Sequence, residues 1–256
     1  LTISAGVANL PYHAKSQKVL LDAADEALYS SKVTGSNRVQ VYLGVLEKIR
    51  QRVEDEDREL VGSLCTLMTL VNAKDRYTYG HSERVAYYVR EFAAYLELPE
   101  EHRRLLEYGA FLHDIGKLET PREILNKRGS LNEQEWAIMQ KHPAWGAEIL
   151  RPVRFLQPII SMVLHHHENY DGTGYPFGLS GEGIPFAARL LRIVDSFDAM
   201  KTIRPYHNPL SAEEIFQELQ SGSGTLYDPN LLANFIGMIK KKDVDINKSV
   251  SLYTFF

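Results

Sequence analysis

The stretch from residue 74 to about residue 241 constrains the fold most, because helix signals follow one another there without a strand pattern of any length. Prolines punctuate the expected helix starts and loops. The run Asp171–Gly183 is dense in glycine and must form an irregular loop. We therefore expect a mainly α domain, a bundle of helices with one long loop. Two capping boxes mark helix starts within it: Asn132 with Glu135, and Ser211 with Glu214.

Composition narrows the function classes. Hydrophobic residues make up 44% and charged residues 24% of the 256 residues, as in ordinary globular proteins. A net charge of -4 argues against a face that binds polynucleotides, although a local basic cluster could still hold a small anion. Cys65 is the only cysteine, so no intrachain disulfide can form, which fits a reducing cytoplasm. The least polar stretch, Val61–Val71, is too short to span a bilayer.

The N-terminal region has a different pattern. Residues 1–43 predict a strand at 1–7, a helix at 19–32, a turn at 35–37 and a strand at 38–43. This is too little chain to bury a core of its own. Because the chain also does not begin with Met, we interpret it as a piece of a longer cytoplasmic protein whose upstream part could be attached to a membrane.

Residues 44–73 predict a long charged helix with one apolar stripe. Two interpretations stay open: the helix packs on its own domain, or it connects two domains and pairs with a second copy. The predicted organisation is an α/β fragment (1–43), a linker helix (44–73), the helical domain (74–241) and a peripheral tail (242–256). The stripe consists of Ile49, Val53, Leu60, Leu64, Leu67 and Val71.

Imidazoles and carboxylates recur along the helical region in a pattern suited to divalent metals. Seven ligands suffice for two ions that share a bridging carboxylate, and such a pair, about 3.5–4 Å apart, can activate water for phosphoryl transfer. Each residue alone has an ordinary explanation, as a surface, cap or core side chain. Together these explanations are improbable, and we expect metal binding. The candidate ligands are His81, His113, Asp114, His142, His166, His167 and Asp195.

Two of the candidate sequences are adjacent pairs, His113-Asp114 and His166-His167. Neighbouring side chains diverge by about 100° on a helix, so one helical face cannot present both. We expect such pairs near helix ends that face a cleft.

Basic residues follow nearby: Lys117 could neutralise a phosphate oxygen or protonate a leaving group. Lys201 and Arg204 could bind phosphate or could belong to a solvated face.

The ordered motifs resemble the HD-GYP domain over about residues 72–240. The motif with His166, His167 and Glu168 that ends in Asp-Gly-x-Gly-Tyr-Pro176 is highly specific to that family. The other motifs are Asp75-x-Tyr-Thr78-x-x-His81, His113-Asp-x-Gly-Lys117, His142-Pro143, Asp195-x-x-Asp198-Ala199 and Arg204-Pro-Tyr206.

The resemblance implies a five-helix HD core with extra helices and hydrolysis of cyclic di-GMP to pGpG and often to GMP. It implies the same seven metal ligands, with Asp114 as the bridge between iron or manganese ions. Lys117, Asp198 and Arg204 would contact the nucleotide, with Lys117 and Asp114 as the catalytic pair. By spacing alone, Asp198 could instead orient a metal ligand. Tyr175 would line the pocket, in a loop that could also contact GGDEF domains.

Two departures from the family pattern modify these expectations. Members with three metals carry a Glu where this chain has Tyr77, so we expect two metals. A basic residue that is common after the Arg204 motif is replaced by His207, which could retune substrate contacts. Alternatives are therefore another cyclic dinucleotide, a nucleotide substrate of the broader HD superfamily, a cyclic di-GMP receptor without catalysis, and a purely structural helical domain.

Residues 1–43 are similar to the end of a GGDEF domain. The resemblance rests on Ile3-Ser-Ala-Gly-Val7 and on Ala24-Asp-Glu-Ala-Leu-Tyr29 with Lys32 and Gly35-x-Asn37. The nucleotide-binding signature of that family is absent, so this chain is not expected to synthesise cyclic di-GMP. Residues 44–73 would then couple the two domains, and a homodimer through them is a further hypothesis.

Overall fold

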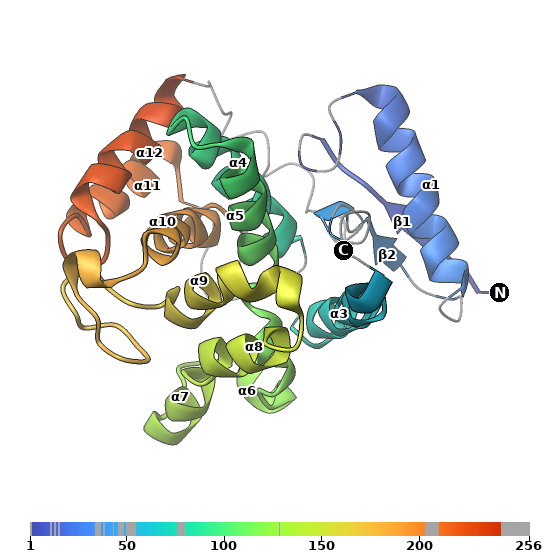
Figure 1. Cartoon of the computed structure of the whole chain (residues 1–256), viewed down its shortest axis with the longest axis horizontal. Coiled ribbons are helices and arrows are strands. Elements are labelled where there is room, and N and C mark those ends of the chain that lie inside the picture. The colour runs from blue at the N-terminus through green and yellow to red at the C-terminus, as the bar shows by residue number, and fades with distance from the viewer. Residues whose placement is uncertain are drawn as a thin grey trace. The chain divides into compact units, whose positions relative to one another are not determined.

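The structure is a computed structural model that falls into two compact units, Leu1–Thr66 and Leu67–Phe256 (Figure 1). Predictions that rest on Tyr77, Arg204, His207 and the tail 242–256 lie outside the described residues. The structure describes residues 2–10, 12, 14, 16–33, 37, 39–42, 44–45, 49, 55–75, 80–127, 129–202 and 210–241.

The first unit holds a strand–helix–strand arrangement: β1 (Ala5–Val7), α1 (Gln17–Val33) and β2 (Val39–Val41). The two strands pair in parallel, so the helix is the crossover between them. Gly6 is required here because a Cβ atom on it would lie 2.1 Å from the carbonyl oxygen of Ala24 in α1. The predicted helix is confirmed, and both predicted strands are present but shorter than predicted, since residues 2–4 lie outside β1.

Helix α3 (Asp55–Lys74) contains both the last residues of the first unit and the first residues of the second. Of the predicted apolar stripe, Ile49, Leu64 and Val71 are buried, whereas Leu60 is exposed. The predicted linker boundaries stay predictions.

The second unit is built from helices, which confirms the mainly α prediction, and its described residues contain no strand beyond the isolated bridge between Ser223 and Tyr227. Helix α4 packs along α5, and α10 contacts α4, α9, α11 and α12 (Figure 1). The elements are α4 (His81–Tyr95), α5 (Glu100–Leu112), η1 (Ile115–Leu118), α6 (Arg122–Leu125), α7 (Glu133–Met139), α8 (His142–Leu150), η2 (Arg154–Ile159), α9 (Ile160–His165), η3 (Gly181–Gly183), α10 (Phe186–Lys201), α11 (Ala212–Ser221) and α12 (Pro229–Lys241).

The core of this unit includes a cluster of aromatic rings contributed by α4, α10 and α12. Phe197 meets both Tyr88 and Phe235 edge-on, with ring centroids 5.2 Å apart in each pair. Phe92 meets Phe235 in the same way at 5.1 Å. All four rings are almost completely buried, and edge-to-face contacts add to the burial of apolar area. The cluster holds α4 and α10 together and so fixes the helices that carry His81 and Asp195.

Among the described residues, no helix combines the length and the apolar character needed to cross a membrane.

Both predicted capping boxes are present. In α11 the Ser211 hydroxyl oxygen accepts a hydrogen bond from the backbone N–H of Glu214, at 3.3 Å. The Glu214 carboxylate accepts one in return from the Ser211 N–H, at 2.7 Å. The box at Asn132 and Glu135 begins α7 in the same way. Each box satisfies N–H groups that have no partner inside their own helix.

Substitution Ser211→Ala removes one of these caps and is expected to lower the free energy of unfolding by about 1 kcal/mol, because a helix N–H loses its acceptor. Urea denaturation followed by circular dichroism measures the loss. Ser221→Ala is the matched control, since Ser221 lies at the other end of α11 and donates only to the carbonyl oxygen of Glu218. Equal stability of the two variants would contradict the prediction.

Candidate metal centre

Both adjacent pairs lie directly beyond a helix end, as their sequence requires. Helix α5 ends at Leu112, immediately before His113 and Asp114. Helix α9 ends at His165, immediately before His166 and His167. The change of backbone direction lets both members of each pair contribute to one site.

Three imidazoles share a local geometry that fixes which ring nitrogen is free. The Nδ1 atoms of His113 and His142 each lie 2.7 Å from the backbone carbonyl oxygen three residues earlier, and that of His166 lies at 2.6 Å. A carbonyl can only accept, so Nδ1 carries the proton and Nε2 presents a lone pair. Metal-binding histidines are held by the same kind of outer contact.

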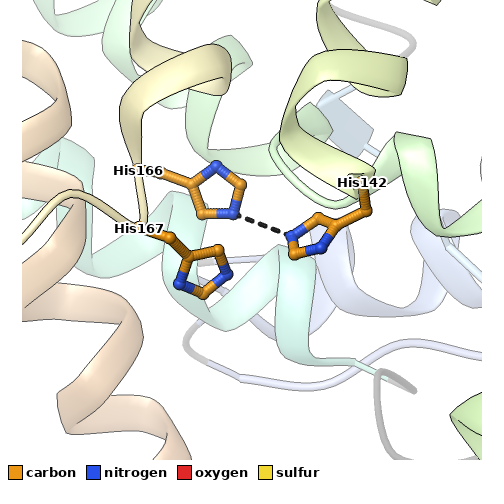
Figure 2. Close-up of side chains that lie close together, drawn as sticks. All are labelled: His142, His166 and His167. Carbon is orange, nitrogen blue, oxygen red and sulfur yellow. Dashed lines mark hydrogen bonds between the residues drawn. The ribbon is translucent and has the colours of Figure 1, made fainter. Parts of the chain in front are cut away.

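Two of these lone pairs face each other. The Nε2 atoms of His142 and His166 are 3.2 Å apart, and Figure 2 shows their rings converging beside the ring of His167. Burial holds the pKa of His142 at about 4, so its ring is expected to be neutral at neutral pH and its Nε2 can only accept. Burial also lowers the pKa of His166 and His167 well below the usual value. A cation between neutral rings would satisfy this arrangement, so these residues fit a metal site.

The candidate ligands form two groups: His142, His166 and His167 in one, and His81, His113 and Asp114 in the other. Within each group all ligand atoms lie within 4.8 Å of one another. Asp114 reaches toward both. Its Oδ1 lies 3.3 Å from His142 Nε2, and its Oδ2 lies 3.5 Å from His113 Nε2. This is the position that a bridging carboxylate needs.

Asp195 extends the second group, because its Oδ1 lies 3.2 Å from Nε2 of His81. The other ring nitrogen of His81 lies 2.7 Å from Oδ2 of Asp198. Burial alone would lower the pKa of His81, but the hydrogen bonds to Asp195 and Asp198 outweigh it and raise this pKa to about 9. The structure therefore brings all seven candidate ligands into one cluster, in which five are buried and His167 and Asp195 are half-buried.

Asp198 has a different environment from the nucleotide contact that the family resemblance implied. Its side chain is fully buried, and it accepts two hydrogen bonds from Arg84, from Nε at 2.7 Å and from Nη2 at 2.9 Å. His81 is a third donor, and because the carboxylate has no exposed surface a base edge cannot reach it. The geometry corresponds to the alternative reading of the spacing, in which Asp198 orients His81. Arg84 was missed in the sequence because nothing there pairs α4 with α10.

Lys117 lies beside Asp114, which precedes it by three residues. In the tight turn of η1 residues three apart eclipse each other, and Lys117 Nζ lies 2.7 Å from Asp114 Oδ2. It also lies 3.4 Å from Oδ2 of Asp75, at the end of α3. Burial would raise the pKa of Asp114, but the charges of Lys117 and the neighbouring histidines hold it well below its usual value.

Lys201 belongs neither to a phosphate site nor to a solvated face, the two interpretations that its sequence position suggested. Its side chain is buried, and Nζ donates a hydrogen bond to the hydroxyl of Tyr88 at 2.7 Å. The ammonium group also lies 5.2 Å from the centre of the Tyr88 ring. Lys201 therefore reinforces the aromatic core, a role that sequence spacing could not reveal.

The glycine-rich loop is anchored beside the cluster by Glu168. The buried Glu168 carboxylate accepts hydrogen bonds from the backbone N–H groups of Phe177, at 2.9 Å, and Leu179, at 3.0 Å. Gly174 packs so closely that a Cβ atom would lie 2.2 Å from the Asn169 nitrogen. The Tyr175 ring then stacks on His167, with centroids 4.8 Å apart. Sequence reasoning gave Glu168 only a place in the motif, not this anchoring role.

Substitution Glu168→Gln is expected to loosen the loop and to lower the free energy of unfolding by about 1–3 kcal/mol, because one backbone N–H loses its buried acceptor. Hydrogen exchange at Phe177 and Leu179 should accelerate in the variant. Glu182→Gln, at an exposed position of the same loop, is the control. Unchanged exchange at both amides would refute the anchoring role.

Comparison with known proteins agrees with this architecture. Residues 66–231 match the family model described as HD domain. The chain is 34% identical over 219 residues to a cyclic di-GMP phosphodiesterase from Thermotoga maritima, covering 84% of this chain and 58% of the relative. It is 38% identical over 182 residues to a 3'3'-cGAMP-specific phosphodiesterase 2 from Vibrio cholerae, covering 70% of this chain and 34% of the relative. The chain thus spans only about a third to three fifths of these two relatives.

Among solved structures, an HDG"Y"P protein from Bdellovibrio bacteriovorus shares the fold, with a TM-score of 0.56 at 20% identity over 77% of this chain and 68% of that one. The helical architecture, the clustered histidines and aspartates and the matched residues together define the class. The chain belongs to the HD domain family.

Proposed function

We propose that this chain is a metal-dependent phosphodiesterase of the HD-GYP type that hydrolyses cyclic di-GMP to pGpG or GMP. The observation that carries the proposal is the pair of ligand groups that share Asp114, with the Nε2 lone pairs of His142 and His166 facing each other. The anchored loop around Tyr175 and the names of the similar proteins support the substrate class.

We assign the seven clustered residues as ligands of two divalent cations, iron or manganese. Such ions supply an activated water and neutralise charge on the phosphoryl oxygens. Asp198 holds His81 in orientation, and Arg84 holds Asp198. We assign Lys117 one of two roles, because its ammonium group lies beside Asp114. It neutralises the charge on a phosphoryl oxygen, or it donates a proton to the leaving oxygen.

A second candidate substrate is 3'3'-cGAMP, because a relative with 38% identity is named for that activity. Both molecules are cyclic dinucleotides with two phosphodiester bonds and differ in one base. The metal centre would bind the phosphodiester groups, which both molecules share. Selection between the bases must therefore come from residues at the rim of the site.

The decisive assay incubates the purified chain with Mn²⁺, or with Fe²⁺ under anaerobic conditions, and separates products of cyclic di-GMP and 3'3'-cGAMP by chromatography. We expect linear dinucleotide from at least one substrate and none after chelation. Tight binding of cyclic di-GMP without any product would indicate that the chain is a receptor and not an enzyme. Turnover of other nucleotides alone would point to the broader HD superfamily.

We further propose that residues 1–43 are the end of a GGDEF domain in a cytoplasmic signalling protein. Support comes from the parallel β1–β2 pair and from Gly6, which packs against α1 at the position that carries the resemblance. Residues 44–73 would link this fragment to the catalytic domain at 74–241 and could pair two chains, and the Gly-Tyr-Pro loop could contact a GGDEF domain. Sedimentation equilibrium tests this pairing. Wild-type protein should be a dimer, and Leu60→Glu should be a monomer.

A further inference from the structure

Several cationic side chains of the second unit already have a partner in the protein. Arg84 pairs with Asp198, Lys117 with Asp114, and Arg189 with Asp228. Lys201 donates to the hydroxyl of Tyr88. These four side chains therefore have structural partners for their donors in the protein itself.

Arg192 differs from these four. It lies on α10 one turn before Asp195, so the two side chains share a helix face with Cβ atoms about 5–6 Å apart. Across the described residues no carboxylate lies within ion-pair distance of Arg192, and its contacts are to a neutral group, the Oδ1 of Asn169. The guanidinium Nε and Nη2 reach that oxygen at 3.3 and 3.0 Å.

The Asn169 contact fixes the direction of the guanidinium. Asn169 is the second residue after His167, and its Nδ2 is held in turn by Thr173 Oγ1, at 3.1 Å. Burial lowers the pKa of His167, and the positive charge of Arg192 acts in the same direction. The guanidinium of Arg192 therefore lies within electrostatic range of His167 and of the Tyr175 ring that stacks on it. Arg192 is half-buried, and Asn169 takes only part of the five N–H donors of its guanidinium.

We propose that Arg192 binds the second phosphate of the cyclic dinucleotide, the one that is not being cleaved. The inference rests on the proposed function, because it assumes a substrate with two phosphodiester anions. The metal cluster receives the phosphate that reacts, and Arg192 neutralises the other through the donors that Asn169 does not occupy. This contact selects a cyclic dinucleotide over a simple phosphodiester.

The test compares wild-type protein with Arg192→Gln, using cyclic di-GMP and bis(p-nitrophenyl) phosphate, which carries a single phosphodiester. We expect KM for cyclic di-GMP to rise about 10- to 100-fold with little change in kcat, because a charge-assisted contact is lost. Turnover of bis(p-nitrophenyl) phosphate should stay within about twofold, because that substrate has no second anion. Calorimetric titration with the bisphosphorothioate analogue of cyclic di-GMP should show the same loss of affinity without turnover.

Two further variants complete the design. Arg192→Lys keeps the charge and the apolar stem and should recover part of the affinity. Arg151→Gln makes the same charge change at an exposed site, where the side chain pairs only with Glu148, and should alter nothing. The inference is overturned if Arg192→Gln affects both substrates equally or neither. If wild-type protein binds and hydrolyses no cyclic dinucleotide, the proposed function falls first and the inference with it.

Discussion

We expect Asp114→Asn to remove most of the bound metal and, under the proposed function, to lower kcat/KM for cyclic di-GMP by at least about a thousandfold. The carboxylate contacts imidazoles of both ligand groups, so a neutral amide weakens both at once. Metal ions contribute several kcal/mol of transition-state stabilisation, and each 1.4 kcal/mol or so corresponds to tenfold in rate. Plasma mass spectrometry of the purified variant and steady-state kinetics measure the two effects on one sample.

Glu148→Gln is the control for Asp114→Asn, because it makes the same loss of negative charge at an exposed position in α8. It should retain metal and turnover. An Asp114→Asn protein that keeps both its metal and its activity would remove Asp114 from the centre. Loss of activity with full metal content would restrict its role to the reaction itself.

Gly116→Ala is expected to destabilise the second unit by at least about 3 kcal/mol, because backbone atoms rather than flexible side chains occupy the space. A Cβ atom there would lie 2.0 Å from the carbonyl oxygen of His142 and 2.5 Å from the nitrogen of Gly146. Helix α8 must therefore move away from η1, and His142 moves with it. We expect Tm to fall by roughly 6–12 °C in calorimetry, together with loss of metal binding.

Gly183→Ala is the matched control for Gly116→Ala, since no atom lies within 4 Å of the added methyl group. Its Tm should remain within about 2 °C of wild type, the shift expected for a surface substitution. Equal Tm values for Gly116→Ala and wild type would show that the close packing of η1 on α8 is not required.

Local rules explain why much of the fold was predictable. The helix predicted at 19–32 extends over Gln17–Val33, and both capping boxes begin helices, because these signals depend on neighbours within one turn. The adjacent pairs also follow a local rule: a helix must end before His113 and before His166 for both members to reach one site.

The parts of the site that sequence reasoning missed depend on contacts between distant segments. Asp198 could equally have faced a nucleotide until α4 brought Arg84 and His81 against it. Lys201 follows the candidate ligands in sequence, yet packing turns it into the aromatic core beside Tyr88. Arg192 could not be singled out from the sequence. Only the structure shows that no carboxylate among the described residues pairs with it.

Anomalous diffraction from crystals grown with manganese tests the central claim most directly. Peaks at the manganese edge should appear within bonding distance of His142, His166 and His167, and of His81 and His113, on either side of Asp114. Full manganese occupancy elsewhere, or no anomalous signal among these side chains, would contradict the metal centre on which the proposed hydrolysis depends.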